Sequence, residues 1–426
     1  MSTAVEFRKI VDQIMAKARS SSKLAKNERP VRLSVSNDSI PSNLAMKRRL
    51  FTSLREQGYT VDGETISLPD NSTKDDFRDV QQHATKKILE KSEQALRPYE
   101  KRLIKYIANG DEVIPRKIEP ELVIVQPKTE QERLFRYAAL HWSIPISSGY
   151  GRRMRFLLMD KSNGKLIGIF ALGDPVFGLK ARDEWIGWDR EVRQQKLYHV
   201  MDAYVLGAVP PYSYLLGGKL VALSTLSNEV RRQFRKRYEE NKPLIGKKRK
   251  PPILAIITTT SALGRSSIYN RIKVNGTTYW HNIGFTLGSG EFHFSNGIYK
   301  DLRAFVVHHC NPTMRHKNWG VGFRNKREIV NCCLGILGLP KSFARHGIKR
   351  EVFAAPLGKK ALEYLRGESK QVQFYDWPLA VLFEKFRDRW LLPRAERMPE
   401  WKNFRRESYL IWHNDPSAGK NTQAPP

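Results

Sequence analysis

The stretch from Leu197 to Phe234 constrains the fold of this chain more than any other part of the sequence. It opens with an apolar, partly β-branched run from His199 to Val209, which is typical of a strand that is covered on both faces. Pro210–Pro211 follows, and because proline donates no ladder hydrogen bond, the strand should diverge from its neighbour there. From Leu216 the apolar residues recur at helical spacing, which predicts one long amphipathic helix reaching Tyr238.

A strand that leads through small residues into a helix is a common anion site, because free backbone N–H groups and the positive end of the helix dipole meet there. Ser213 is placed to cap the helix, and Gly217 and Gly218 would let a ligand approach the backbone closely. Two interpretations stay open. The turn is either a cofactor cradle or a place where the glycines let the helix pack tightly on the sheet. The predicted cofactor-binding residues are Ser213, Leu216, Gly217, Gly218 and Lys219.

The charge balance indicates the class of partner. The chain of 426 residues has 74 Lys and Arg against 43 Asp and Glu, a net charge of +31. Such a surplus repels itself unless it meets a polyanion, so nucleic acid, DNA or RNA, is the expected partner. No apolar run is long enough to span a bilayer, and we expect no membrane partner. Only three cysteines occur and two of them are adjacent, which favours a cytoplasmic protein without disulfides.

Basic residues gather on the predicted helix after the Gly-Gly pair and in the connection that follows it. Val230 and Phe234 fix the inward face of that helix, so the arginines should lie on its outward face. Arginine forks can grip phosphates, although a run of charge can also be a solvated face. The predicted nucleic-acid contacts are Arg231, Arg232, Arg235, Lys236, Lys247, Lys248, Arg249 and Lys250.

The remaining segments predict an α+β protein in five parts. Residues 1–110 are expected to be mostly helical with a small hairpin at Asp62-Gly63, either as a winged-helix-like DNA reader or as an arm packed on the core. Residues 111–140 form a linker and a short helix. Residues 141–329 form the α+β core, with a hairpin at Ser162-Asn163-Gly164, a strand in 251–264 and a closing hairpin around Gly288 and Gly290. Residues 330–415 are expected to be helical again, and 416–426 to be a disordered tail.

Several long and unusual strings stand out in the chain: GRRMRFLLMDKSNGKLIGIFAL, MDAYVLGAVPPYSYLLGGKL, TTTSALGRSSIYNRIK and RWLLPRA. These strings resemble the DruA family of the bacterial Druantia type I anti-phage defence system. The resemblance runs along nearly the whole chain and is densest from about Trp142 to His293. It implies a role in defence against phage in the bacterial cytoplasm, alongside other Druantia proteins that include a large helicase. It implies no established catalytic residue.

The core is also similar to the GNAT N-acetyltransferase fold. This resemblance implies a GNAT-like mixed sheet and places residues 199–238 where such proteins bind the pyrophosphate of acyl-CoA, although the usual Arg/Gln-x-x-Gly-x-Gly/Ala motif is replaced by SYLLGGK. Tyr269-Asn270-Arg271, followed by Ile283-Gly284-Phe285, resembles the Tyr-x-x-x-Gly-Phe region. The resemblance therefore points to Tyr269 as an acid that would protonate a leaving thiolate, since a phenol pKa near 10 lies above that of a thiol, near 8.5. The alternative is a Tyr269 packed in the core.

Acidic residues raise a third hypothesis, a metal-dependent nuclease with Asp183 as a catalytic residue. Asp183 and Glu184 lie between Arg182 and Trp185, so an ion pair that supports the corner with Trp188 is the alternative. His308, His309, Cys310 and His316 lack a second Cys-x-x-Cys arm, and adjacent histidines on a strand would point to opposite faces; we expect no metal. Nucleic-acid binding ranks first among the three hypotheses, and acyl transfer and nuclease activity remain the alternatives.

Overall fold

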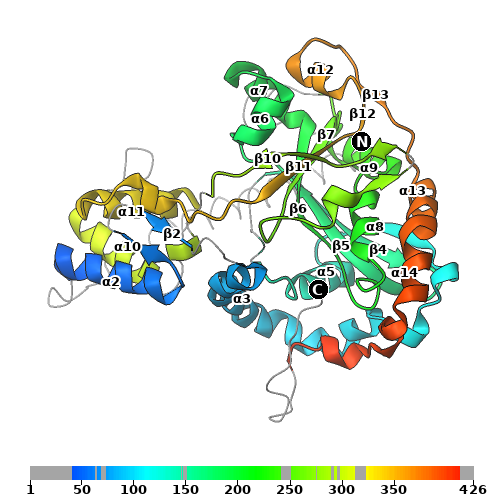
Figure 1. Ribbon diagram of the computed structural model, residues 1–426, viewed down its shortest axis with the longest axis horizontal. Coiled ribbons are helices and arrows are strands. Elements are labelled where there is room, and N and C mark those ends of the chain that lie inside the picture. Colours follow the sequence, from blue (N-terminus) through cyan, green and yellow to red (C-terminus); the bar gives the residue numbers. More distant parts are fainter. Residues whose placement is uncertain are drawn as a thin grey trace, which may run out of the picture.

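The computed structural model describes residues 41–62, 65–68, 73–144, 146, 151–240, 251–274, 276–288, 292–294, 298–311 and 323–412. Its centre is a seven-stranded sheet in the order β10–β11–β7–β6–β5–β4–β3 (Figure 1). Every neighbouring pair is antiparallel except β6 and β7. This mixed sheet with helices on both faces confirms the expected α+β class. The strands are β3 (Pro120–Ile124), β4 (Arg153–Asp160), β5 (Lys165–Gly173), β6 (Val200–Ala208), β7 (Ile256–Thr260), β10 (His281–Phe285) and β11 (Glu351–Pro356).

Strand β6 is the apolar strand that the sequence predicts between His199 and Val209. Its parallel pairing with β7 covers only Val200 to Asp202, and a bulge interrupts its pairing with β5 just beyond, between Ala203 and Val205. The two parallel strands therefore diverge well before Pro210–Pro211, whose peptide bond is cis. The divergence from β7 thus begins at Asp202 and not at the prolines, where the sequence analysis placed it.

The expected single helix from Leu216 to Tyr238 is wrong. The segment forms two helices, α8 (Gly217–Ser224) and α9 (Asn228–Tyr238). Helix α8 is buried almost throughout and packs on β5, β6 and α13 (Leu379–Phe386). Helix α9 is amphipathic and buries Val230, Phe234 and Tyr238.

Hydroxyl groups account for the break between the two helices. Ser224 Oγ donates a hydrogen bond to the carbonyl of Leu220, and Thr225 Oγ1 donates to a carbonyl three residues earlier. Such bonds compete with continuation of the helix. The backbone N–H of Asn228 then donates to the carbonyl of Trp377, which lies far along the chain, so the second helix starts in a new direction.

The two faces of the sheet are covered differently. One face carries α8, α9, α13 and α14 (Leu392–Arg397) over a single large apolar core. On the other face the cover is split between two clusters. One contains α4 (Glu100–Leu103) and α5 (Glu130–Ala139); the other contains α6 (Lys180–Ile186), α7 (Arg190–Lys196) and α12 (Ala361–Arg366). Along β6, Val200 belongs to one cluster and Val205 to the other, so Asp202 and Tyr204 fall between them.

A smaller lobe lies beside the main body (left in Figure 1) and has an apolar core of its own. It joins α2 (Asn43–Glu56) and the hairpin of β1 (Thr60–Val61) and β2 (Ile66–Ser67) to α10 (Ile298–His309) and α11 (Phe323–Ile336). The predicted hairpin is present, although Gly63 lies outside the described residues. Segments that are far apart in the sequence thus share one core, which the sequence did not indicate. The long helix α3 (Lys74–Leu96) links this lobe to the main body.

The C-terminal part, expected to be mostly helical, contains several helices and also a strand of the sheet. Strand β11, from within residues 330–415, lies inside the sheet between β7 and β10. The expected closing hairpin around Gly288 is therefore wrong, because β10 pairs with β11 rather than with the residues that follow it. Gly290, the tail at 416–426 and residues 1–40 lie outside the described residues. Short strand pairs complete the described chain: β8 (Lys273–Val274) with β9 (Thr277–Thr278), and β12 (Gly358–Lys359) with β13 (Gln373–Phe374).

Candidate nucleic-acid interface

The turn before α8 differs in its hydrogen bonds from the predicted anion cradle. Several of its backbone N–H groups are used within the turn: Leu216 donates to Ser213, Gly217 donates to Tyr212 and Lys219 donates to Leu216. An anion site needs such N–H groups free to point at the ligand. The predicted cap by Ser213 is wrong, because the N-cap position is Leu216 and the helix has no side-chain cap. The turn therefore offers an anion fewer backbone donors than the sequence analysis supposed.

Close packing explains the glycines of this turn instead. A Cβ on Gly217 would lie 2.6 Å from the carbonyl oxygen of Tyr212, and a Cβ on Gly218 would lie 3.2 Å from Cδ1 of Ile268. Lys219 is buried beside them, where its Nζ donates to the carbonyl of Ile268 over 3.1 Å. Burial, reinforced by the charges of nearby arginines, lowers the pKa of Lys219 to about 8. The chain itself fills the space that the cradle would need.

Tyr269 lies inside the apolar core and not at a site open to a ligand. Its ring centre is 5.4 Å from that of Trp280 and 5.0 Å from that of Phe353. Burial raises the pKa of Tyr269 to about 12. These contacts match the alternative of a packed tyrosine that the sequence left open.

Asp183 sits at the centre of a buried hydrogen-bond network. Its carboxylate accepts from Arg182 Nη2 at 2.7 Å, Arg193 Nη1 at 2.7 Å, Trp188 Nε1 at 3.0 Å and the backbone N–H of Leu179 at 2.9 Å. Burial raises the pKa of Asp183, but the bonds from Trp188 and Arg182 outweigh it and hold the pKa below its ordinary value. Because protein donors occupy both oxygens, this carboxylate has the surroundings of a structural ion pair and not those of a metal ligand.

The histidines that prompted a zinc hypothesis lie on a helix and not on a strand. His308 and His309 end α10, where His309 Nδ1 lies 2.8 Å from the carbonyl oxygen of Phe305. His316 lies outside the described residues. Within the part of the chain that the structure describes, no three His, Cys, Asp or Glu side chains gather as metal ligands.

The structure separates the eight predicted nucleic-acid contacts into three groups. Arg231 turns inward: it donates to the carbonyl of Tyr375 at 2.7 Å, and its guanidinium lies 4.5 Å from the ring centre of Phe374. Arg232, Arg235 and Lys236 are exposed on the outer face of α9. Lys247, Lys248, Arg249 and Lys250 lie outside the described residues. Arg231 therefore ties α9 to β13, and the exposed three are those that could reach a ligand.

A groove runs beside this face of α9, which we name the α9 groove, with a volume of about 670 Å³. Its walls are α9, the segment before β7 and the residues around β13. Glu229 and Glu239 partly offset its positive charge, since they pair with Arg232 at 3.1 Å and Arg235 at 3.6 Å. The ring of Phe374 is 42% exposed. The groove thus offers arginine forks next to an exposed ring, a combination suited to phosphates and unpaired bases. Its lining is Asn228, Glu229, Arg231, Arg232, Arg235, Glu239, Pro251, Pro252, Ile253, Leu254, Phe374 and Pro378.

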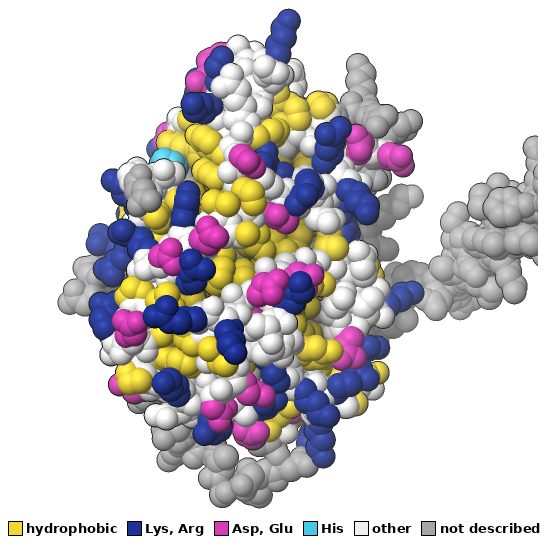
Figure 2. All heavy atoms as spheres, turned by 90° about the vertical axis from the view of Figure 1, so that its right-hand side faces the viewer, with side chains coloured by type: hydrophobic (Ala, Val, Ile, Leu, Met, Phe, Trp, Pro, Cys, Tyr) yellow, Lys and Arg dark blue, Asp and Glu magenta, His cyan; other side chains and the backbone are white. Residues whose placement is uncertain are grey.

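One side of the molecule mixes charges of both signs. On the side shown in Figure 2, where α13 and α14 lie in Figure 1, Lys and Arg side chains alternate with Asp and Glu around a broad apolar area. This view shows no continuous basic surface. Net charge alone therefore does not locate a surface for nucleic acid, and individual grooves have to be compared.

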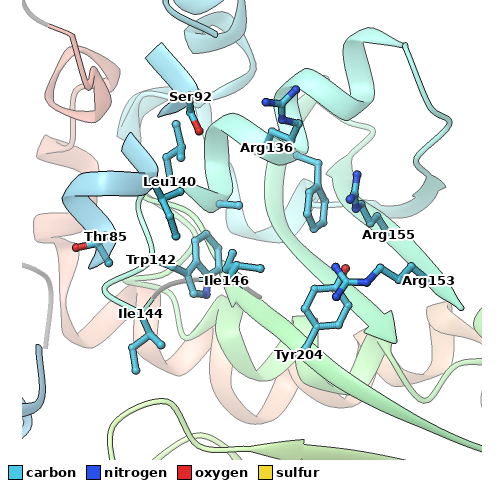
Figure 3. Close-up of a pocket in the computed structure, with 13 residues that line it drawn as sticks. Thr85, Ser92, Arg136, Leu140, Trp142, Ile144, Ile146, Arg153, Arg155 and Tyr204 are labelled. Carbon is cyan, nitrogen blue, oxygen red and sulfur yellow. The ribbon is translucent and has the colours of Figure 1, made fainter. Parts of the chain in front are cut away.

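The sequence analysis did not single out a second basic cavity, which lies on the opposite face of the sheet from α8 (Figure 3). Three arginines line it, Arg136 from α5 and Arg153 and Arg155 from β4, together with Trp142 and Tyr204. A signal was present in the sequence: alternate residues of a strand share a face, so Arg153 and Arg155 had to lie side by side.

Comparison with known proteins gives two matches. The family described as "Druantia protein DruA" matches residues 71–367. A Druantia protein DruA of Escherichia coli (strain UMEA 4076-1) is 40% identical over 361 residues, which cover 84% of this chain and 89% of the relative. No solved structure matches the chain.

Proposed function

The chain belongs to the DruA family, whose members are components of Druantia anti-phage defence, and we propose that it serves this defence by contacting nucleic acid through the α9 groove. The observation that carries the proposal is that Arg232 and Arg235 line the same groove as the exposed residue Phe374, while Lys236 is exposed on the same helix. Guanidinium and ammonium groups would neutralise phosphates, and the ring would stack on a base that is not paired.

The groove favours a single strand over an intact duplex. A ring can stack only on a base that is not already stacked in a helix, and Phe374 lies in the groove wall rather than on a protruding element. A partner that supplies single strands is the kind of protein that such a site needs. We therefore propose that the chain acts with other Druantia proteins, a helicase among them, in the cytoplasm. Its three cysteines are all thiols, in keeping with a reducing compartment. Among the described residues, no helix combines the length and apolar character needed to cross a bilayer.

We also propose that the sheet is GNAT-like, as its resemblance suggested. The support is topological: β6 and β7 form a parallel pair in an otherwise antiparallel sheet, they diverge past Asp202, and α8 follows directly from β6. The proposal concerns the fold of the core. Acyl transfer ranks below nucleic-acid contact, because the turn before α8 uses its own N–H groups and Tyr269 is enclosed.

The test of nucleic-acid contact is a triple charge reversal, Arg232→Glu with Arg235→Glu and Lys236→Glu. The matched control carries the same change in net charge at exposed sites far from the groove, Lys101→Glu with Arg116→Glu and Lys117→Glu. Binding of a labelled single-stranded oligonucleotide is measured by fluorescence anisotropy at several salt concentrations.

Three lost phosphate contacts should lower the slope of log affinity against log salt by about 2, at about 0.7 for each contact on a single strand. The control should keep the slope of the unmodified chain. Equal slopes and affinities for the two triple variants would remove the α9 groove as the binding surface.

A further inference from the structure

Apolar side chains, aromatic rings and arginines together line the cavity of Figure 3. It lies between α3, α5 and the face of the sheet at β4 and β6, next to the place on β6 where the apolar cover of that face is interrupted. Leu140, Ile144 and Ile146 close it on the side of Trp142, and the three arginines lie on the opposite side (Figure 3). The cavity therefore has an apolar half and a cationic half.

Gly207 of β6 leaves room for the indole ring of Trp142 at the cavity. A Cβ on Gly207 would lie 2.6 Å from Cζ2 of Trp142, so the indole can rest on β6 only because this residue has no side chain. Tyr204 stands on the same strand, and its hydroxyl is buried without a hydrogen-bond partner among the described residues. Two rings, both partly exposed, thus border one space. A planar ligand would find stacking surface there and one polar atom to bind.

The three arginines of the cationic half have different surroundings. The guanidinium of Arg153 lies 4.4 Å from the ring centre of Tyr204. Arg155 pairs with Glu132, with Nη1 3.0 Å from the carboxylate oxygen. Arg136 is exposed, and no carboxylate pairs with it in the described chain. None of the described residues that line the cavity is acidic, so this lining favours an anion.

The size of the cavity limits the ligand. Its volume is about 190 Å³, below the roughly 300–1,000 Å³ of pockets that enclose a drug-sized molecule. It can therefore take one ring system, while the rest of the ligand stays outside. A wider groove of about 620 Å³ continues from it along α3, shares Thr85, Leu140 and Trp142 with it, and adds Lys86. This continuation offers a path for a chain that extends beyond the bound ring.

We propose that this cavity binds one unpaired nucleotide, with its base against Trp142 and Tyr204 and its phosphate at Arg136 and Arg153. The proposal rests on nucleic-acid contact as the proposed function, but it assigns a second site on another face of the sheet. The groove along α3 favours a nucleotide within a single strand, while a free nucleotide shares the same chemistry. An alternation of rings and arginines is the arrangement by which proteins hold bases that have left the stack.

The test uses the full chain with two substitutions, Trp142→Ala and Arg136→Glu, each made alone. Trp142→Phe is the control for the first because it keeps a ring, and Lys101→Glu is the control for the second because it makes the same charge change at an exposed site of α4. Affinity for a labelled single-stranded 12-mer is measured by anisotropy. Thermal midpoints with AMP and with inorganic phosphate test the free nucleotide. Arg136 is exposed, so this variant should fold even if loss of Trp142 disturbs the chain.

Loss of stacking on one base should weaken binding of the 12-mer by about 5- to 150-fold, and the two controls should bind like the unmodified chain. A midpoint raised by AMP but not by phosphate, and only when Trp142 is present, would assign the site to a free nucleotide. No AMP effect with weakened 12-mer binding would assign it to a strand. Variants that bind both probes like the unmodified chain would overturn the proposal. If only the α9 triple variant loses the 12-mer, the α9 groove stands and this cavity falls; the reverse result favours the cavity alone.

Discussion

The substitution Asp183→Asn separates the structural role of this carboxylate from the catalytic one. Both oxygens of Asp183 accept hydrogen bonds, one of them from Arg182 and Trp188 and the other from Arg193 and Leu179. An asparagine has the same shape, but it turns one acceptor into an NH₂ donor that faces other donors. It also removes the negative charge beside Arg182, whose side chain is fully buried. The change therefore leaves a buried cation without its closest partner.

Breaking a buried ion pair in this way costs about 3–5 kcal/mol of folding free energy. We expect Asp183→Asn to lower the free energy of unfolding in urea by about 3 kcal/mol, since the amide keeps one acceptor. Glu184→Gln is the matched control, because Glu184 is the neighbouring carboxylate, is 67% exposed and forms an ion pair with Lys180 at 3.7 Å. An exposed pair of this kind contributes about 0–1 kcal/mol, so the control should unfold almost like the unmodified chain.

A single result would refute the structural role: an Asp183→Asn protein that unfolds at the same urea concentration as the Glu184→Gln control. If Asp183→Asn instead raised the free energy of unfolding, the carboxylate would destabilise the native fold, which would indicate that it is retained for a function. The pH dependence gives a second check. Because hydrogen bonds hold the pKa of Asp183 below its ordinary value, its contribution is present above that ordinary value and is lost as pH falls through the lower pKa of the folded state.

Two further predictions concern His293 and the turn before α8. Burial lowers the pKa of His293 to about 4, although its ring bonds to the carbonyl of Phe343. The unfolded chain therefore takes up a proton first as pH falls below about 6.5, and the free energy of unfolding should drop by about 2–3 kcal/mol near pH 4.5. Urea unfolding of His293→Gln should show a smaller drop over the same pH range, and an equal drop would contradict this cause. Acetyl-CoA should leave the thermal midpoint unchanged, since several N–H groups of the turn before α8 are bonded within the turn and Tyr269 is buried; a rise that grows with acetyl-CoA concentration would restore the acyltransferase hypothesis.

Local signals in the sequence predicted the parts of the fold that depend on neighbours in the chain. The hairpin at Ser162-Asn163-Gly164 joins β4 and β5, where Gly164 has a φ of 71° that favours glycine. The apolar run before Pro210 is β6, and the short helix expected after the linker is α5. Each of these features is specified by residues only a few positions apart, so composition and periodicity were sufficient.

Local sequence signals could not predict which strands pair when they are far apart in the chain. Strand β11 joins the sheet between β7 and β10, although it lies more than 60 residues beyond β10 in the sequence. An apolar run predicts a buried strand but does not specify which strand it pairs with. The end of α8 shows the same limit on a smaller scale. The stripe of apolar residues continues past Ser224, but the N–H of Asn228 bonds to Trp377, and only the folded chain brings that carbonyl into reach.

The two basic sites show why charge in a sequence indicates a partner class without locating the surface. Arg231 and Arg232 are neighbours on one helix, yet the first is held inward by the carbonyl of Tyr375 and the second is exposed. Arg152 and Arg153 are neighbours as well, and Asp174 pairs with Arg152 at 2.7 Å while Arg153 lies over the ring of Tyr204 and lines the cavity. Whether an arginine supports the fold or faces a ligand is thus decided by acceptors from distant segments. A net charge of +31 sets how strongly a polyanion is attracted, and the placement of carbonyls and carboxylates decides which few guanidinium groups are left to bind it.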